Sequence, residues 1–237
     1  MDQPEYELMD AVEDRMWWYR ALHARLVDAL VGTSGRVVDV GCGTGGFLAR
    51  LRAARPDLDA IGVEWHDVAA RRACRKAGVP VARGSANELP LATGSCDAAV
   101  LADVLCHGAV EPERALAELR RVLRPGGKLV INMPAYAWMM SAHDVRVHST
   151  RRQTAGQTIA MLQDAGFMEV RARYWNSLLF PIMVVHRKLL ARGDAASDVA
   201  PFPPWLNVMF HGMTSLERSL PFALPMGGSV MAIAERP

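Results

Sequence analysis

The chain has 237 residues, enough to bury one sizeable hydrophobic core, and α/β folds of this length are commonly single domains. Its formal net charge of +2 gives no large positive field, so we do not expect binding to nucleic acid, which depends on neutralising phosphates. The four cysteines form no CxxC pair and no Cys/His array at zinc spacing, which predicts free thiols, a reducing compartment and no metal site.

The first segment, MDQPEYELMD, is acidic and lacks the apolar stretch of a secretory signal. No later apolar run is long enough to span a bilayer, so a cytoplasmic protein without a transmembrane segment is expected. Residues 1–31 look helical and predict an N-terminal helical cap. Near its acidic part lie three aromatic residues, Trp17, Trp18 and Tyr19, followed by Arg20.

From residue 36 onward, short β-branched runs alternate with helical stretches, which is typical of a parallel sheet with helices on both faces. Helix signals include Pro112 at a start, the RPGG turn at 124–127 as a stop, and Thr154 with Gln157 as a capping box. We expect an α/β fold with a doubly wound, seven-stranded, mostly parallel sheet in one domain, whose core covers residues 36–175. The predicted strands are 36–40, 60–64, 79–83, 98–102, 128–132, 169–174 and 229–234.

Residues 176–226 separate the last two strands and are expected to form a helical insertion, with residues 227–237 as the last strand. The first half of the insertion, SLLFPIMVVHRKLLAR, is apolar and then basic. It could be a cap helix, a dimer helix or a helix at a membrane surface, and packing is the interpretation we favour.

The stretch VVDVGCGTGG follows the first predicted strand and opens a helix. Its glycines allow backbone N–H groups to approach a ligand at the carboxyl end of the strand. Gly41, Gly43 and Gly46 fit the dinucleotide pattern, whereas Gly41, Gly43 and Gly45 fit the methyl-donor pattern. Glu64 ends the next strand, where a carboxylate can accept both hydroxyls of a ribose. These residues predict a nucleoside cofactor and leave NAD and S-adenosylmethionine both open.

A wider set of motifs carries a family resemblance. Together with the glycine loop, the stretches GVEW, RGSANELPL, CDAAVLADVLCH and LRPGGKLVI resemble the class I S-adenosylmethionine-dependent methyltransferases, between residue 36 and about residue 175. More narrowly, the chain is similar to bacterial small-molecule methyltransferases of the ubiquinone/menaquinone-biosynthesis type. The resemblance implies a Rossmann-like methyltransferase fold, S-adenosyl-L-methionine as cofactor, S-adenosyl-L-homocysteine as product, and a methyltransferase activity.

The resemblance also implies roles for single residues. The glycines would lie beneath the methionine part of the donor, Asp39 would bind its ammonium group through water, and Glu64 would hold the ribose. Trp65 would lie against the adenine. Residues 85–87 stand where the family has an adenine contact that is often acidic, and here the acid is missing. The expected cofactor-binding residues are Tyr19, Arg20, Asp39, Gly41, Cys42, Gly43, Gly45, Glu64, Trp65, Ser85, Ala86, Asn87, Ala102, Asp103 and His107.

Transfer of a sulfonium methyl group needs an in-line nucleophile and a site that excludes water, and it needs no covalent enzyme intermediate. An acceptor that must also lose a proton needs a base that titrates near neutrality. The candidates are His107, which follows the fourth predicted strand, and His143 and Asp144, which follow the fifth, with His148 nearby. In ADVLCH, Cys106 stands where the family commonly has a Glu.

The stretch PAYAWMMSAHDVRVH shows neither helix nor strand periodicity, and such apolar segments are often core packing. However, the residues that follow parallel strands meet at one edge of the sheet. We therefore expect this stretch, the N-terminal aromatic residues and the residues after the sixth strand to form an apolar pocket for a flat or greasy acceptor. The expected acceptor-binding residues are Trp17, Trp18, Tyr136, Trp138, Met139, Met140, His143, Trp175 and Asn176.

The sequence thus predicts methyl transfer to a small apolar or aromatic acceptor at a carbon, oxygen or nitrogen atom, in the biosynthesis of a specialised metabolite. A second possibility is an isoprenoid or lipid-like acceptor delivered at a membrane surface by the stretch 177–192. A dinucleotide oxidoreductase and a non-methylating protein that only binds the donor are also open. The expected partner is a small molecule, and both a monomer and a homodimer remain open.

Overall fold

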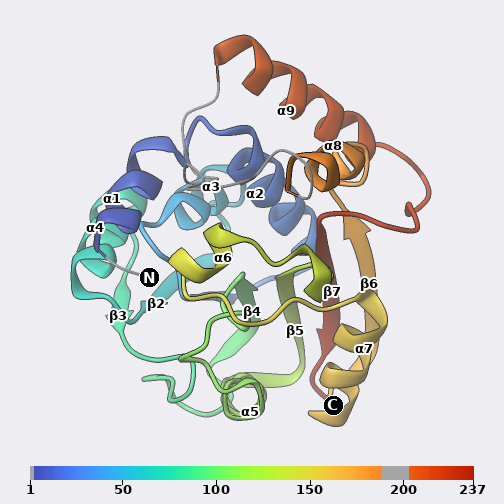
Figure 1. Cartoon of the computed structure of the whole chain (residues 1–237). Helices are drawn as coiled ribbons and strands as arrows, with labels where there is room; N and C mark the ends of the chain where they lie inside the picture. Colours follow the sequence, from blue (N-terminus) through green and yellow to red (C-terminus); the bar gives the residue numbers. More distant parts are fainter. Residues whose placement is uncertain (1–2, 188–202) are drawn as a thin grey trace.

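A seven-stranded sheet with the strand order β3-β2-β1-β4-β5-β7-β6 runs through the centre of the protein (Figure 1). The computed structural model describes residues 3–187 and 203–237. The strands are β1 (Arg36–Val40), β2 (Asp59–Glu64), β3 (Val81–Arg83), β4 (Cys96–Ala102), β5 (Leu123–Pro134), β6 (Met168–Trp175) and β7 (Ser229–Glu235).

All neighbouring strands from β3 to β5 pair in parallel, and only β7 runs against its neighbours β5 and β6. The prediction of a doubly wound, mostly parallel, seven-stranded sheet is therefore confirmed. Because β7 is antiparallel to both neighbours, β6 runs parallel to β5, and residues after β1, β2, β4, β5 and β6 reach the same edge of the sheet.

Only β1 has both predicted boundaries, and two of the differences in the other strands have a clear cause. Strand β5 begins at Leu123, so the RPGG turn predicted as a helix stop lies inside the strand. This early start pairs Leu123 with Cys96, and the register then shifts before Ala98. Strand β3 begins at Val81, two residues late, because Pro80 has no N–H to offer a neighbouring strand.

Helices cover both faces of the sheet and bury two apolar layers. One layer holds Leu116, Leu119 and Leu162 between the sheet and the helices α5 and α7. The other holds Leu26 and Leu48 between the sheet and the helices α2, α3 and α4. The helices are α1 (Gln3–Val12), α2 (Trp17–Ala29), α3 (Gly46–Ala54), α4 (Asp67–Ala77), α5 (Pro112–Val122), α6 (Ala142–Arg146), α7 (Ala155–Asp164), α8 (Phe180–Val185) and α9 (Pro204–Arg218), with a 3-10 turn, η1 (Ala137–Met139).

The predicted helix signals at two starts are confirmed. Pro112 is the first residue of α5, where a missing N–H costs no hydrogen bond. At the start of α7, the Gln157 N–H donates to the Thr154 hydroxyl (3.3 Å), and the Thr154 N–H donates to the Gln157 side-chain oxygen (2.9 Å). This reciprocal capping box fixes where α7 begins.

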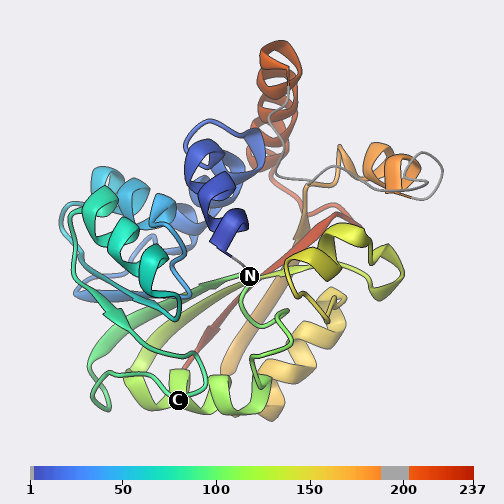
Figure 2. The same ribbon diagram turned by 60° about the vertical axis from the view of Figure 1, so that its left-hand side comes forward.

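The N-terminal helices and α9 lie together over the carboxyl ends of the strands (Figure 2). The Asn207 side chain accepts from the Trp17 N–H (2.7 Å) and donates to the Arg15 carbonyl (2.9 Å), and the rings of Trp17 and Phe210 meet edge to face. The insertion therefore returns to the helical cap that precedes β1. Of the stretch 177–192, residues 188–192 lie outside the described residues. Among the helices that are described, none is long and apolar enough to cross a membrane.

Candidate functional site

A cavity of about 1080 Å³ opens at the carboxyl ends of β1, β2 and β4. We call it the main cavity. Residues after these strands form its floor, while α1, α2, α8 and α9 contribute its walls. It lies where open α/β sheets bind cofactors, and its volume suits a nucleoside together with a small molecule.

The glycine turn after β1 has a backbone that only glycine adopts easily. Gly41, Gly43 and Gly45 all have positive φ angles, of 75°, 55° and 91°. A Cβ atom on Gly41 would lie 2.5 Å from Val104, and one on Gly45 would lie 2.6 Å from the Ala73 backbone. Gly41 and Gly43 line the main cavity with Cys42, whereas Gly45 lets α3 pack against α4.

Glu64 is buried at the end of β2 and accepts three hydrogen bonds. Its donors are the Gly43 N–H (2.9 Å), the His66 N–H (2.9 Å) and the Tyr6 hydroxyl (3.0 Å). The first two tie the glycine turn to the start of α4. The third comes from α1, and the Tyr6 ring stacks on His66 at 4.7 Å.

Helix α1 therefore lies on the residues that were expected to hold the donor. Tyr6 occupies one acceptor site of Glu64, and the Met9 methyl lies 2.7 Å from the point where a Gly43 Cβ would be. A ribose that hydrogen-bonds Glu64 through both hydroxyls has to displace the Tyr6 hydroxyl.

Two buried acids, Asp39 and Glu64, line the main cavity beside the glycine turn. Asp39 is buried, and burial together with Glu64 raises its pKa to about 8. Within the described residues, no hydrogen bond reaches the Asp39 carboxylate. A desolvated carboxylate is stabilised by a nearby cation, and the sulfonium and ammonium groups of S-adenosylmethionine supply positive charge. The glycine turn, which leaves room for a ligand, and these acids thus fit S-adenosylmethionine.

The segment expected at the adenine also lines the main cavity. In residues 85–87, the Asn87 side chain is already used, since it donates to the Ala109 carbonyl (3.0 Å) and accepts from the Glu111 N–H (2.9 Å). The Ser85 hydroxyl accepts from the Asn87 N–H and keeps its own proton for a ligand. Trp65 lines the same end of the cavity and is 68% exposed.

Asp103 follows β4 and is linked through Asn132 to Trp175 by two hydrogen bonds. The Asn132 side chain donates to the Asp103 carboxylate (2.9 Å), and the Trp175 ring N–H donates to the Asn132 side-chain oxygen (2.7 Å). Asp103 has a positive φ of 56°, an uncommon backbone conformation outside glycine, and its N–H donates to the Asn132 carbonyl. Burial raises the pKa of Asp103 to about 7, against the lowering effect of Asn132. Asp103 and Ala102 both line the main cavity.

His107 lines the main cavity on the same loop. Its Nδ1 atom is buried and has no hydrogen-bond partner among the described residues. Burial lowers the pKa of His107, so the imidazole is neutral near pH 7 and can accept a proton.

Asp144 is held in a buried ion pair. Arg152 donates to both of its oxygens, at 2.9 and 3.1 Å, and the Ser141 N–H and hydroxyl donate to the second oxygen. With these partners Asp144 orders the α6 turn and is poorly placed to take a proton from an acceptor. His143 lies in α6, and its side chain is outside the described residues. His148 has a positive φ and does not line the main cavity.

The aromatic residues after β5 lie away from the main cavity. Tyr136 stacks on Tyr174 at 5.3 Å and lies 5.6 Å from Trp138, and both Tyr136 and Trp138 contact Phe180. Met139 is buried, and its carbonyl accepts from Arg187. The expected acceptor residues outside the lining of the main cavity are Tyr136, Trp138, Met139, Met140 and Trp175.

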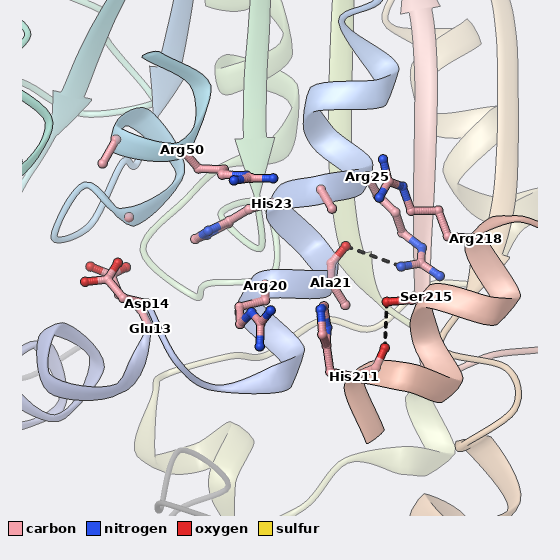
Figure 3. Close-up of a pocket in the computed structure, with 13 residues that line it drawn as sticks. Glu13, Asp14, Arg20, Ala21, His23, Arg25, Arg50, His211, Ser215 and Arg218 are labelled. Carbon is pink, nitrogen blue, oxygen red and sulfur yellow. Dashed lines mark hydrogen bonds between the residues drawn. The ribbon is translucent and has the colours of Figure 1, made fainter. Parts of the chain in front are cut away.

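The N-terminal aromatic residues divide between two cavities. Trp17, Trp18 and Tyr19 line the main cavity, and Asn176 joins them from the end of β6. Arg20 does not, because it projects from α2 into a second, smaller cavity between α2, α3 and α9 (Figure 3).

Several lining residues were absent from the prediction. Helix α1 contributes Tyr6 and Met9, the turn after it contributes Glu13, and the insertion contributes Leu179 and Met183. Tyr6, Met9 and Glu13 are three and four residues apart, which places them on one helix face, so the spacing held a signal. Nothing in the sequence, however, showed which part of the sheet that face would cover.

Comparisons with known proteins agree with this geometry. Residues 38–131 match the family model described as a methyltransferase domain. A ubiquinone/menaquinone biosynthesis C-methyltransferase of Syntrophotalea carbinolica is 32% identical over 137 residues, which cover 54% of this chain and 56% of that protein. The chain spans about half the length of such curated relatives.

Two solved structures have a similar fold. An S-adenosylmethionine-dependent methyltransferase of Thermotoga maritima superposes with a TM-score of 0.62 at 22% identity, covering 99% of this chain and 96% of that one. The second is the geranyl diphosphate C-methyltransferase of Streptomyces coelicolor in complex with Mg²⁺, geranyl diphosphate and S-adenosyl-L-homocysteine. It superposes with a TM-score of 0.63 at 17% identity, covering 92% of this chain and 79% of that one. At these identities the likeness establishes the fold.

Proposed function

We propose that this chain, a class I S-adenosylmethionine-dependent methyltransferase by its matched domain and its fold, transfers a methyl group to a small apolar or aromatic acceptor. The observation that carries the proposal is one cavity in which a glycine turn and buried acids lie beside apolar side chains. S-adenosylmethionine, when bound, supplies an activated sulfonium methyl group. The oxidoreductase hypothesis has no support, because the matching family and relatives are methyltransferases.

The donor half of the cavity has three proposed tasks. The backbone of Gly41 and Gly43 lets the methionine part approach closely, Asp39 attracts the ammonium group, and Glu64 accepts the ribose hydroxyls. The Ser85 hydroxyl is the free donor for the adenine. These assignments follow from the charge, burial and open hydrogen-bonding capacity of each group.

The acceptor half is proposed to be the region of Trp17, Trp18, Leu179, Met183 and Phe210, which all line the main cavity. These side chains can bury a flat or greasy molecule and exclude water from the reacting methyl group. Because they belong to α2, α8 and α9 and to the turn before α8, the acceptor would be enclosed by the N-terminal cap and the insertion.

Asp103 is the group we assign as general base. It lines the main cavity, burial raises its pKa to about 7, and Asn132 holds its orientation. His107 is the second candidate, since its buried Nδ1 atom has no partner among the described residues. Asp144 is left as a structural residue because its oxygens are bound by Arg152 and Ser141.

Two measurements test the proposed function. Calorimetry should show that S-adenosylmethionine and S-adenosylhomocysteine bind, while NAD does not. Incubation with a methyl-labelled donor and a panel of small phenols, quinols and isoprenoids should then transfer label to at least one acceptor. Binding of the donor without transfer to any acceptor would instead support a non-methylating protein, and absence of binding would overturn the proposal.

A lipid-like acceptor delivered from a membrane is a second candidate. Helix α8 contributes Ile182 and Met183 to the main cavity, and its residues Ile182 and Val185 are 51% and 46% exposed. An apolar helix at the mouth of a cavity suits extraction of an isoprenoid from a bilayer. Co-sedimentation with vesicles, compared between the natural chain and an Ile182→Ser, Val185→Ser variant, tests this candidate. Equal partitioning of both proteins would exclude it.

A further inference from the structure

A second cavity of about 310 Å³ lies behind α2, between α2, α3 and α9 (Figure 3). We call it the arginine cavity, because Arg20, Arg25, Arg50 and Arg218 all line it. It adjoins the main cavity at one end, where Glu13 and His23 belong to the lining of both. None of the roles proposed above uses this cavity.

The acids at one edge of the arginine cavity share a lysine that lies outside it. The Glu13 carboxylate lies 2.6 Å from the Lys76 ammonium group and accepts from the Thr44 hydroxyl (2.6 Å), and Asp14 lies 3.7 Å from the same Lys76. Lys76 also pairs with Asp10. One ammonium group offsets only part of the charge of three carboxylates, so this edge stays acidic. Among the described residues, however, neither Glu13 nor Asp14 pairs with an arginine of the cavity, and both lie at the end away from His211 and Arg218 (Figure 3).

Two of the four arginines already have partners. The Arg25 guanidinium donates to the Thr214 carbonyl (2.8 Å), lies 3.5 Å from Glu217 and stacks over the Trp175 ring. Arg218 makes a two-pronged pair with Asp28. These two hold α9 against α2 and the sheet.

Arg20 and Arg50 have no such partner. Within residues 3–187 and 203–237, neither guanidinium forms an ion pair or a hydrogen bond. In Figure 3 His211 lies beside Arg20, whereas Arg50 lies beside His23, and the His211 Nδ1 atom is buried without a hydrogen-bond partner in the same part of the chain. Both arginines are exposed, so the cavity is open to solvent on their side, and it combines two guanidinium groups outside any ion pair with an imidazole nitrogen that has no partner.

The two histidines in the cavity wall indicate the sign of its field. Burial lowers the pKa of His211, and Arg20 and Arg25 lower it further. Burial likewise lowers the pKa of His23 to about 3, with Arg50 as the next cause. For both imidazoles the charged groups that shift the pKa are positive. An anion in the cavity would supply the opposite charge.

We propose that the arginine cavity binds a phosphate-type oxyanion, held by the guanidinium groups of Arg20 and Arg50 and by the imidazole of His211. Guanidinium groups bind the oxygens of phosphate in pairs, and a cavity of this size holds a phosphate group with part of a small molecule attached. Because Arg20 and Arg50 come from α2 and α3, and His211 from α9, the anion would tie the cap and the insertion together. The proposal does not depend on methyl transfer.

Thermal unfolding in potassium phosphate and in potassium chloride, at equal ionic strength and pH 7.5, tests the proposal. We expect phosphate to raise the Tm by about 3–5 °C once it exceeds its Kd about tenfold. Arg20→Gln and Arg50→Gln should each lose most of this rise. Arg75→Gln, which removes an exposed arginine of α4 outside both cavities, should keep it.

Titration calorimetry with inorganic phosphate and with ribose 5-phosphate distinguishes the two sources of the anion. Tighter binding of the ester would indicate a phosphorylated small molecule, and equal binding would indicate free phosphate. The proposal is overturned if chloride raises the Tm equally, if both Gln variants keep the rise, or if Arg75→Gln loses it.

Discussion

The Tyr6 hydroxyl donates to the Glu64 carboxylate over 3.0 Å, so a residue of the first helix occupies an oxygen that the donor ribose is proposed to use. Burial and Glu64 raise the pKa of Tyr6, so the hydroxyl keeps its proton and donates throughout the neutral range. Without the donor, Tyr6 thus fills the proposed ribose site on Glu64. When the donor binds, a hydrogen bond from the ribose to Glu64 replaces the one from Tyr6.

Replacing Tyr6 with Phe should therefore strengthen donor binding. The variant removes the competing hydroxyl and keeps the ring that stacks on His66. A net hydrogen bond is worth about 0.5–1.5 kcal/mol, so the Kd for S-adenosylhomocysteine should fall about 2- to 10-fold. Calorimetry measures this, with Tyr136→Phe as a control outside the main cavity. Weaker binding in Tyr6→Phe would mean that Tyr6 contacts the donor directly.

Replacing Glu64 with Gln should weaken donor binding. The amide keeps the size of the side chain, but it loses the charge and one of the two oxygens that accept from Gly43, His66 and Tyr6. Hydrogen bonds to a charged group are worth about 1.5–3 kcal/mol, so the Kd should rise at least about 10-fold. Glu113→Gln on α5 is the matched control, because that carboxylate is exposed and remote. An unchanged Kd would remove Glu64 from the donor site.

The proposed role of Asp103 predicts the pH dependence of turnover. A base with a pKa of about 7 is active above that pH, so the rate should fall as the pH decreases through neutrality. Asp103→Asn should lower kcat at least about 100-fold and leave donor affinity nearly unchanged. Asn132→Ala removes a hydrogen bond that favours the charged form, so the acid limb should move to higher pH. If His107→Gln abolishes turnover and Asp103→Asn does not, the base is His107.

The donor end of this site could be predicted from the sequence because it depends on local geometry. A glycine turn after a strand and an acid at the end of the next strand meet wherever the two strands pair in parallel, as β1 and β2 do. Tyr6 and Arg20 could not be placed this way. Their positions depend on how the cap packs over the sheet, and the direction in which each side chain points is set by tertiary contacts that leave no local pattern.

The aromatic stretch after β5 shows a second limit. Its residues reach the predicted edge of the sheet, but the chain then turns outward through η1, and Tyr136 packs on Tyr174 and Phe180. A positive φ of 57° at Tyr136 redirects the chain at this point, and no residue type signals it. The choice between pocket wall and packing for this stretch depends on such tertiary contacts.

The position of Trp138 gives a direct test of that choice. The ring is 50% exposed and contacts Tyr136 and Phe180 rather than the main cavity. Trp138→Ala should therefore lower the Tm by a few degrees, through lost aromatic contacts worth about 0.5–1.5 kcal/mol, and leave kcat/KM unchanged. Trp18→Ala, in the main cavity, should lower kcat/KM. If Trp138→Ala instead lowered kcat/KM and left the Tm unchanged, Trp138 would belong to the acceptor pocket.

The buried acids predict how stability depends on pH. The pKa of Asp39 is raised to about 8, above the value near 4 of an unfolded chain, so the folded state binds the extra proton between these limits. Its contribution to stability is full below about pH 4 and is lost as the pH rises toward 8. Asp39→Asn cannot ionise, so its Tm relative to the natural chain should increase from pH 5 to pH 8. Saturating S-adenosylmethionine should reduce this difference, because a cation beside Asp39 stabilises the charged form. A Tm difference that stays constant with pH would show that Asp39 is ionised in the folded chain throughout this range.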